Sequence, residues 1–273
     1  MALPFWLSIG ALSLVQAALV AAPRPAVSSL LERLSSRWWA LILPLSIVVV
    51  IAAVAEDSST ARFLTYLALV AVPPLAAAAL GWVLRGGRPP LALLTVPLFA
   101  LAWVAKGSLS GQAAALALSA LACVSLGWLL ACVVPGRWLK LGIYAMAAID
   151  TYLVASDLLQ APNAVLNTAA PGGGLPRLQF IHFGSALMGF GDIFIAAVLG
   201  ALLARDRRLQ LTGAALAAVI GISFDLLFFA VDELPATVPI ALTLAMLEVM
   251  TRGGLKLGRN DGHGRTEAGD HRR

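Results

Sequence analysis

The stretch SALMGFGDIFIAAVLGALLA, residues 185–204, places one carboxylate, Asp192, in a run that is otherwise uncharged and mostly apolar. An apolar run of this length is long enough to cross the ~30 Å hydrocarbon core of a bilayer as a helix. A charged side chain is costly at that depth and is usually kept there for a function. We therefore expect Asp192 to lie in a membrane-spanning helix and to take part in chemistry.

The whole chain has the composition of an integral membrane protein. Of its 273 residues, 60% are apolar and 12% are charged, whereas about a quarter of the residues of a soluble domain are charged. Apolar runs of roughly 17–25 residues fill most of the chain and leave no room for a water-soluble domain. Breaks at charged, Pro and Gly residues predict nine transmembrane helices, at 5–22, 38–55, 63–84, 90–105, 112–134, 138–156, 179–204, 209–231 and 235–251.

The charges between these segments predict how the chain is oriented. Lys and Arg follow every odd-numbered segment, whereas the other connections are neutral, weakly charged or acidic. Because cytoplasmic loops carry the excess of Lys and Arg, we expect the N-terminus outside and the C-terminus in the cytoplasm. Residues 252–273 form a Gly-rich, charged tail that is expected to be disordered. The compact loops favour a prokaryotic plasma membrane.

Two further acids, Asp150 and Asp225, lie within predicted helices. Asp150 is ten residues beyond Lys140, and Asp192 is thirteen residues before Arg205. At ~1.5 Å per residue, both acids lie roughly 15–20 Å from the cytoplasmic side. Asp225 lies nearer the outer face and is the poorer partner. We therefore expect Asp150 and Asp192 to meet near the middle of the bilayer.

Such a pair would have a definite chemistry. Two carboxylates in one dry site cannot both ionise, so the pair shares a proton. One aspartate can then draw a proton from water while the other donates to the carbonyl oxygen or leaving nitrogen of an amide, which is general acid/base hydrolysis. The predicted chemistry is hydrolysis of a peptide bond.

Two further features of the sequence bear on the surroundings of the acids. If 179–204 is one helix, small residues share the face of the carboxylate, at Ser185, Gly189, Asp192, Ala196 and Gly200. This stripe has an alternative reading as a helix-packing face, with Asp192 hydrogen-bonded to a neighbour. In the ninth segment, Pro239 removes a backbone donor within the bilayer, which predicts a cavity beside it.

Three of these elements resemble, in order, motifs of the presenilin and signal peptide peptidase family of intramembrane aspartyl proteases. GFGD (189–192) matches the family's Gly-x-Gly-Asp in the seventh helix. ID (149–150) stands where the family usually has Tyr-Asp in the sixth helix. LPATVP (234–239) resembles its Pro-Ala-Leu motif at the start of the ninth.

The resemblance covers residues 138–251, the sixth to ninth predicted helices, and implies that they form the catalytic part. Residues 1–137, the first five predicted helices, contain no motif of the family. Ile149 stands in place of the usual tyrosine, and Thr237 in place of leucine. Position by position, the resemblance implies that Asp150 and Asp192 are the catalytic pair and that Gly189 and Gly191 allow close approach. It also implies that Pro235, Ala236 and Thr237 belong to a segment that contacts substrate.

The resemblance also implies the kind of substrate. The expected orientation is similar to that of signal peptide peptidase, so the substrates would be type II transmembrane helices or signal-peptide remnants, which bind as an extended strand beside exposed backbone. The expected partners are a transmembrane peptide and membrane lipid, with no nucleic acid. No metal or organic cofactor is implied.

Other functions fit parts of the pattern. The prepilin peptidase family also uses Gly-x-Gly-Asp and an earlier aspartate, although a lysine usually follows its motif and here Ile193 does. A transporter would use Asp150, Asp192 and Asp225 to carry protons or cations, with a helix broken at Pro239. A noncatalytic relative could act as a membrane chaperone. For Asp225 a structural hydrogen bond is favoured, and Asp157 is read as a solvated acid at a helix end.

Overall fold

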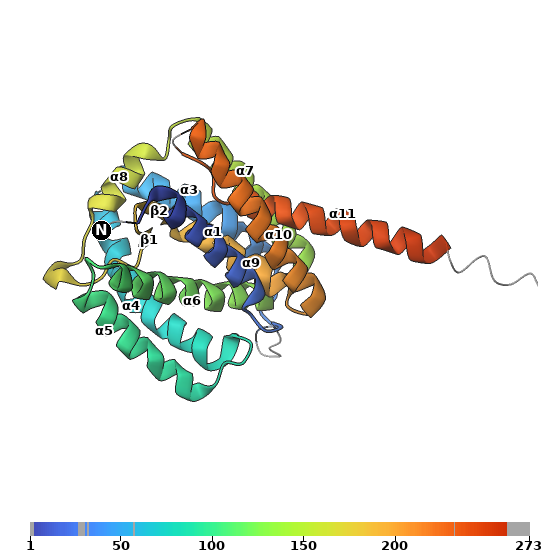
Figure 1. The fold of residues 1–273 in the computed structure, drawn as a ribbon, viewed down its shortest axis with the longest axis horizontal. Coiled ribbons are helices and arrows are strands. Elements are labelled where there is room, and N and C mark those ends of the chain that lie inside the picture. Colours follow the sequence, from blue (N-terminus) through green and yellow to red (C-terminus); the bar gives the residue numbers. More distant parts are fainter. Residues whose placement is uncertain (1–2, 27–30, 32, 57, 232, 261–273) are drawn as a thin grey trace, which may run out of the picture.

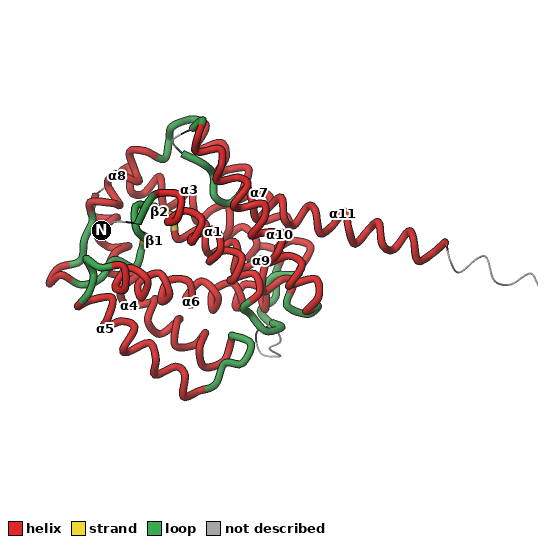
Figure 2. The backbone as a smooth tube through the Cα atoms, viewed as in Figure 1, coloured by secondary structure: helices red, strands yellow, loops and turns green. Residues whose placement is uncertain are grey.

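A computed structural model describes residues 3–26, 31, 33–56, 58–231 and 233–260. The chain is 77% helical, and the described residues include a single β-sheet of two strands (Figure 2). Five helical segments are long and apolar enough to cross a bilayer: Arg37–Val54, Ser59–Val83, Leu109–Val133, Gly136–Ala155 and Arg207–Phe229. Three shorter apolar helices accompany them. These features are those of a mostly helical, multi-pass membrane protein.

Each of the nine segments expected from the sequence contains at least one helix. The helices and strands follow in the order α1 (Phe5–Ala21), η1 (Arg37–Leu41), α3 (Ile42–Glu56), α4 (Ser58–Ala78), η2 (Ala79–Val83), η3 (Pro89–Leu94), α5 (Thr95–Val104), α6 (Leu109–Val133), α7 (Gly136–Ala155), α8 (Gln160–Thr168), η4 (Gly172–Gly174), β1 (Phe180–Phe183), β2 (Ala186–Gly189), α9 (Phe190–Leu203), α10 (Arg207–Asp225), η5 (Leu226–Phe229) and α11 (Val238–Asn260). Helix α8 and η4 occupy much of the connection 157–179, and α11 extends into the segment that was expected to be a disordered tail.

Helix α9 lies at the centre of the bundle, between α1 and α6 (Figure 1). Its middle is fully buried at Ala196, Ala197 and Leu199. Small residues let its neighbours approach closely, since a Cβ on Gly127 of α6 would lie 2.8 Å from the carbonyl carbon of Ala197. A Cβ on Gly200 would likewise meet backbone atoms of α1. Of the predicted small-residue stripe, Gly200 packs against α1 and Ala196 is fully buried, so the helix-packing reading is confirmed for these two residues.

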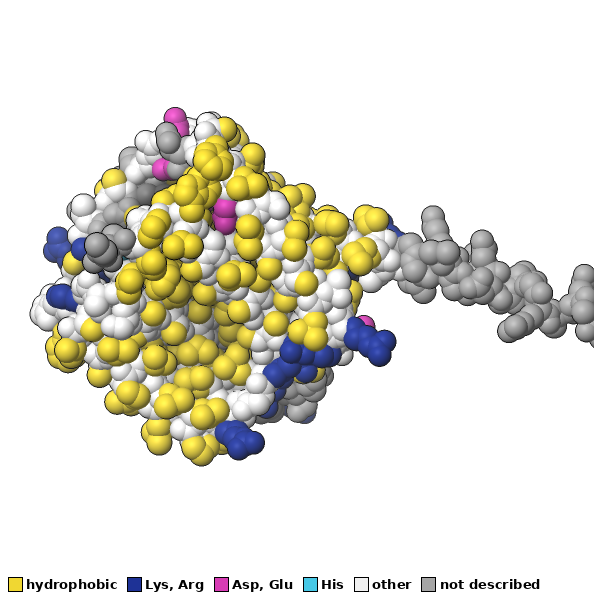
Figure 3. Space-filling view, in the orientation of Figure 1, with side chains coloured by type: hydrophobic (Ala, Val, Ile, Leu, Met, Phe, Trp, Pro, Cys, Tyr) yellow, Lys and Arg dark blue, Asp and Glu magenta, His cyan; other side chains and the backbone are white. Residues whose placement is uncertain are grey.

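The other helices surround this centre on two sides. Helices α4 and α5 pack against α6, while α10 packs against α1, and α11 contacts both α10 and α7. Helix α3 lies against α7. Hydrophobic side chains cover most of the face seen in Figure 3, and Lys and Arg gather at its edges. An apolar surface of this extent suits contact with lipid.

The seventh predicted segment, 179–204, is not one helix. Residues 180–189 form an antiparallel β-hairpin in which Phe180 pairs with Gly189 and Phe183 with Ala186. Its turn needs Gly184, which has a φ of +62° and lies against Ser8. The prediction was wrong because apolar content alone does not separate a short strand from a helix. Ser185 and Gly189 therefore belong to the hairpin and share no helical face with Asp192.

The ninth predicted segment also begins differently. Helix α11 starts at Val238, so Pro239 occupies its second position, and Pro235 lies before it. The first N–H groups of a helix have no partner within the helix, so proline removes no bond there. The expected break at Pro239 is therefore wrong.

A buried glutamine joins several segments at the end of the molecule that carries Arg85, Arg205 and Arg207. The Gln210 side chain donates to the carbonyls of Pro23 (2.9 Å) and Gly200 (3.2 Å). Its oxygen accepts hydrogen bonds from Arg85 (3.0 Å) and Arg207 (2.9 Å). Burial, and then the charge of Arg207, lower the pKa of Arg85. The amide thus ties the chain after α1 to α9 and α10.

Candidate active site

Asp150 lies on α7 and is held by the segment that precedes α11. Its carboxylate oxygen Oδ2 accepts a hydrogen bond of 2.6 Å from the hydroxyl of Thr237 and a longer one of 3.4 Å from the backbone N–H of the same residue. Asp150 is 5% exposed and Thr237 is fully buried. A hydrogen bond this short and buried is strong when the acceptor is charged. The segment 234–237 is therefore fixed against the first acid.

Thr237 is one of the two positions where the residue differs from the motif expected in the sequence. A leucine at this position could not donate a hydrogen bond, whereas the threonine hydroxyl does. The substitution thus has a definite structural effect, which is an added donor on Asp150. Ile149, the other departure, lies half-buried beside Asp150.

Asp192 lies in the first turn of α9, directly after the β-hairpin, and not in the middle of a helix as expected. Its Oδ2 accepts a hydrogen bond of 3.0 Å from the backbone N–H of Gly189. A carboxylate at this position satisfies one of the free N–H groups at the start of a helix. Strand β2 and helix α9 therefore meet at the acid, and the backbone next to it turns from extended to helical.

Asp150 and Asp192 lie on two helices, α7 and α9, that contact each other. Gly191, the residue before Asp192, faces α7, since a Cβ there would lie 3.1 Å from Cε of Met146. Met146 is one helical turn before Asp150. The charge of Asp150 acts on Asp192. Gly191 thus lies at the contact with α7, and the two acids lie on neighbouring helices.

A residue that the sequence analysis did not single out, Gln16 of α1, connects two of the motifs. Its side-chain nitrogen Nε2 donates to the backbone carbonyl of Asp192 at 2.9 Å and to that of Ala236 at 3.2 Å. Gln16 is 3% exposed. An amide inside an apolar helix is unfavourable unless it has partners, and that cost was the signal that could have revealed it. Gln16 holds the start of α9 beside the segment that bonds Asp150.

The remaining acids lie apart from this pair. Asp225, at the end of α10, accepts a hydrogen bond of 2.7 Å from the Ser13 hydroxyl of α1. The structural bond expected for Asp225 is thus confirmed. Asp157 is exposed and accepts only a weak hydrogen bond, of 3.3 Å, from Gln160 in the part of the chain described. Its predicted position as a solvated acid at a helix end is confirmed.

Two further findings bear on the chemistry of the site. Over the residues that the structure describes, no group of three or more His, Cys, Asp or Glu is placed to hold a metal ion. Comparisons of the chain with models of known families, with curated proteins and with solved structures return no match. The site is therefore interpreted from its own geometry.

Proposed function

We propose that this chain is an intramembrane aspartyl protease that uses Asp150 and Asp192 to hydrolyse a peptide bond within a transmembrane substrate. The observation that carries the proposal is that a buried acid, Asp150, and a half-buried one, Asp192, lie on two contacting helices, α7 and α9, of a largely apolar bundle. Isolated acids in such surroundings are costly, and a pair that shares one proton reduces the cost while providing an acid and a base.

In this proposal the two acids have different partners and different roles. Asp150 already accepts the hydroxyl proton of Thr237 in a hydrogen bond, and Asp192 accepts the N–H of Gly189. One carboxylate draws a proton from water as the water attacks the scissile carbonyl carbon. The other carboxyl protonates the carbonyl oxygen, which gives a gem-diol. The first carboxyl, which now holds the proton from water, then protonates the leaving nitrogen, while the second takes a proton back from a gem-diol hydroxyl as the C–N bond breaks.

The β-hairpin suits the handling of an extended substrate. A helical substrate must unwind before its amide can be attacked, and an unwound segment needs hydrogen bonds within the bilayer. Strand β2 ends at Gly189, immediately before Asp192, and is one of only two strands in the described sheet. A substrate strand that pairs with a free edge of this sheet would have its backbone satisfied close to the acids.

The proposal includes nine transmembrane helices with the N-terminus outside and the C-terminus in the cytoplasm. The alternation of basic and non-basic connections supports this topology. The substrates are then type II helices or signal-peptide remnants. Labelling of single cysteines introduced into successive loops, with a membrane-impermeant maleimide, tests the topology: reactive and protected loops should alternate.

The activity is tested with purified protein in detergent and a labelled type II transmembrane peptide. Asp150→Asn and Asp192→Asn should each abolish cleavage, because each removes one member of the pair. Asp157→Asn is the matched control, since it makes the same change at an exposed acid, and it should retain activity. Cleavage by both Asn variants at the wild-type rate would refute the proposal. Proton or cation flux that needs Asp192, without cleavage, would instead favour a transporter.

A further inference from the structure

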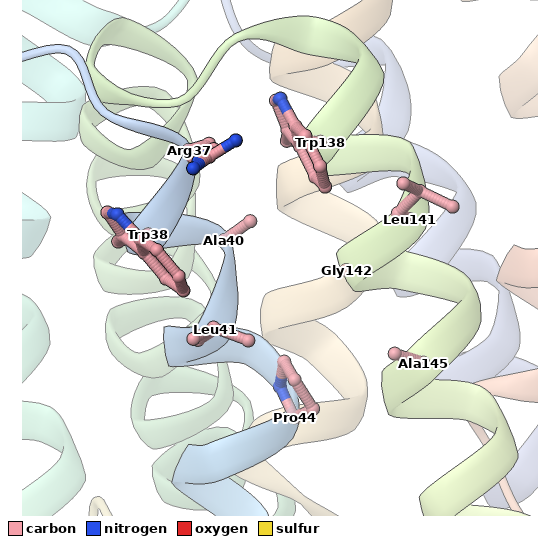
Figure 4. Close-up of a pocket in the computed structure, with 9 residues that line it drawn as sticks. All are labelled: Arg37, Trp38, Ala40, Leu41, Pro44, Trp138, Leu141, Gly142 and Ala145. Atoms are coloured by element: carbon pink, nitrogen blue, oxygen red, sulfur yellow. The ribbon is translucent and has the colours of Figure 1, made fainter.

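A groove lies between η1 with the start of α3 on one side and α7 on the other, away from the two acids. Its walls come from the runs 37–44 and 138–145, and its volume is about 410 Å³ (Figure 4). This volume lies within the range of small-molecule sites, which is roughly 300–1,000 Å³. Ala40, Gly142 and Ala145, which carry little or no side chain, are among the residues that line it.

The groove has an apolar part that opens to the surroundings of the protein. Leu41 and Leu141, on opposite walls, are 45% and 56% exposed. Trp38 is 66% exposed. Large apolar side chains this exposed in a membrane segment face hydrocarbon. The groove therefore opens sideways toward the acyl chains of the lipid.

The other end of the groove is positively charged. Figure 4 shows Arg37 and Trp138 together at one end, with Leu41, Pro44 and Ala145 further along. The guanidinium of Arg37 lies 6.0 Å from the ring centroid of Trp138, and that of Arg137 lies 5.7 Å from it. Arg37 lines this end of the groove, and Arg137, which lies outside the lining, is next to the same aromatic ring.

These two arginines have no acid of their own in the part of the chain described: neither lies within 4 Å of a carboxylate. Lys140, in contrast, pairs with Glu248 at 2.9 Å. Arginine matches the geometry of a phosphate group and can bind it with two parallel hydrogen bonds. Tryptophan is typical of the headgroup level of a membrane. The charged end is thus suited to a lipid phosphate.

We propose that this groove binds one anionic phospholipid, with the phosphate between Arg37 and Arg137 and one acyl chain along Leu41, Leu141 and Ala145. An anionic lipid is favoured over a zwitterionic one because the charged end presents two cations and would repel an ammonium headgroup. In the topology proposed above, this end faces the cytoplasmic leaflet, where basic pockets between helices bind anionic headgroups. The site does not depend on the proposed protease activity.

The test measures binding of dioleoyl phosphatidylglycerol to the purified full chain by native mass spectrometry in detergent, with dioleoyl phosphatidylcholine as the second probe. Arg37→Gln/Arg137→Gln should weaken phosphatidylglycerol binding about 10- to 30-fold, because two phosphate-level cations are lost. It should weaken phosphatidylcholine binding less, because the choline ammonium already offsets part of the attraction between the arginines and the phosphate. Arg88→Gln/Arg208→Gln is the matched control, since both arginines are exposed and lie outside the groove. It should bind as the wild type does.

A third variant tests the apolar part. Ala145→Leu keeps both arginines and fills the hollow, so it should weaken the binding of both lipids. Unchanged thermal unfolding of each variant shows that the fold is intact. The proposal is overturned if the groove and control double variants lose equal affinity, if wild type binds the two lipids equally, or if Ala145→Leu binds as well as wild type. An uncharged transmembrane peptide is the last probe. If it displaces phosphatidylglycerol from the wild type but not from Ala145→Leu, the groove binds a helix and not a lipid, and the proposal is also overturned.

Discussion

Replacement of Thr237 by valine tests whether its hydroxyl tunes Asp150. The change keeps the shape of the side chain and removes the donor of the 2.6 Å hydrogen bond. Both residues are buried, so water cannot readily replace the lost donor. The backbone N–H of Thr237, at 3.4 Å, remains as a weaker donor. The variant therefore removes one defined interaction at the proposed active site.

The size of the effect follows from this geometry. A hydrogen bond to a charged group contributes about 1.5–3 kcal/mol. If the bond acts on Asp150 in the transition state, its loss lowers kcat/KM by roughly 10- to 150-fold, because each ~1.4 kcal/mol is a factor of ten. The remaining N–H places the expected loss in the lower part of this range. Most of it should appear in kcat, since the hydroxyl bonds the acid and not the substrate.

The assay is cleavage of a labelled type II transmembrane peptide, with Thr237→Ser as the matched control. Serine keeps the hydroxyl and loses a methyl group, so this variant should stay within about threefold of wild type if the hydrogen bond is what matters. Equal losses in the valine and serine variants would show that packing, and not the hydroxyl, is responsible. Wild-type kcat/KM in the valine variant would refute the role of the bond.

A measurement of stability tests the same contact without any activity. Thr237→Val should lower the free energy of unfolding by about 1–3 kcal/mol. The same substitution should have a smaller effect in an Asp150→Ala background, because the acceptor is already gone. This double-mutant cycle isolates the pair interaction. Additive effects would show that Thr237 and Asp150 do not interact.

Three other predictions follow from contacts outside the acid pair. Gln16→Leu leaves the carbonyls of Asp192 and Ala236 without their donor and should lower both kcat and the thermal unfolding temperature, with a loss of about 1–3 kcal/mol in stability; unchanged kcat would contradict a positioning role. Asp225→Asn can still accept the Ser13 hydrogen bond, so cleavage should stay within about threefold of wild type; a large loss would place Asp225 in the mechanism. Gln210→Leu removes four hydrogen bonds and should lower the unfolding temperature without a change in KM. An unfolding temperature equal to that of the wild type would show that these four hydrogen bonds contribute little to stability.

Much of the helical framework could be predicted because apolar runs long enough to cross a bilayer have few alternatives to helix. The prediction that Asp150 and Asp192 meet came from counting residues from Lys140 and Arg205, since a helix advances by a fixed rise; the structure places the two acids on contacting helices. The hairpin before α9 could not be recognised in this way. Its strands are only four residues long and as apolar as the helix that follows, although the glycine turn between them was a signal for it.

The position of Pro239 shows a second limit. Whether a proline breaks a helix or starts one depends on a shift of a few residues in the helix start, and an apolar run does not define that start. The segment 234–237 lies outside the helix and contacts Asp150 instead. The expected break in the helix is thus replaced by a proline-bounded start of α11 beside the first acid.

The sequence by itself determined that this chain belongs in a membrane, which segments are apolar enough to be helices, and which acids lie within apolar runs, because these properties depend on composition and on distance along the chain. Only the tertiary structure decided that the Thr237 hydroxyl reaches Asp150, that Gln16 joins Asp192 to Ala236, and that Asp192 begins a helix. A hydrogen bond needs two groups within about 3 Å, and the rotation of each helix about its axis, which brings them there, is set by packing against its neighbours.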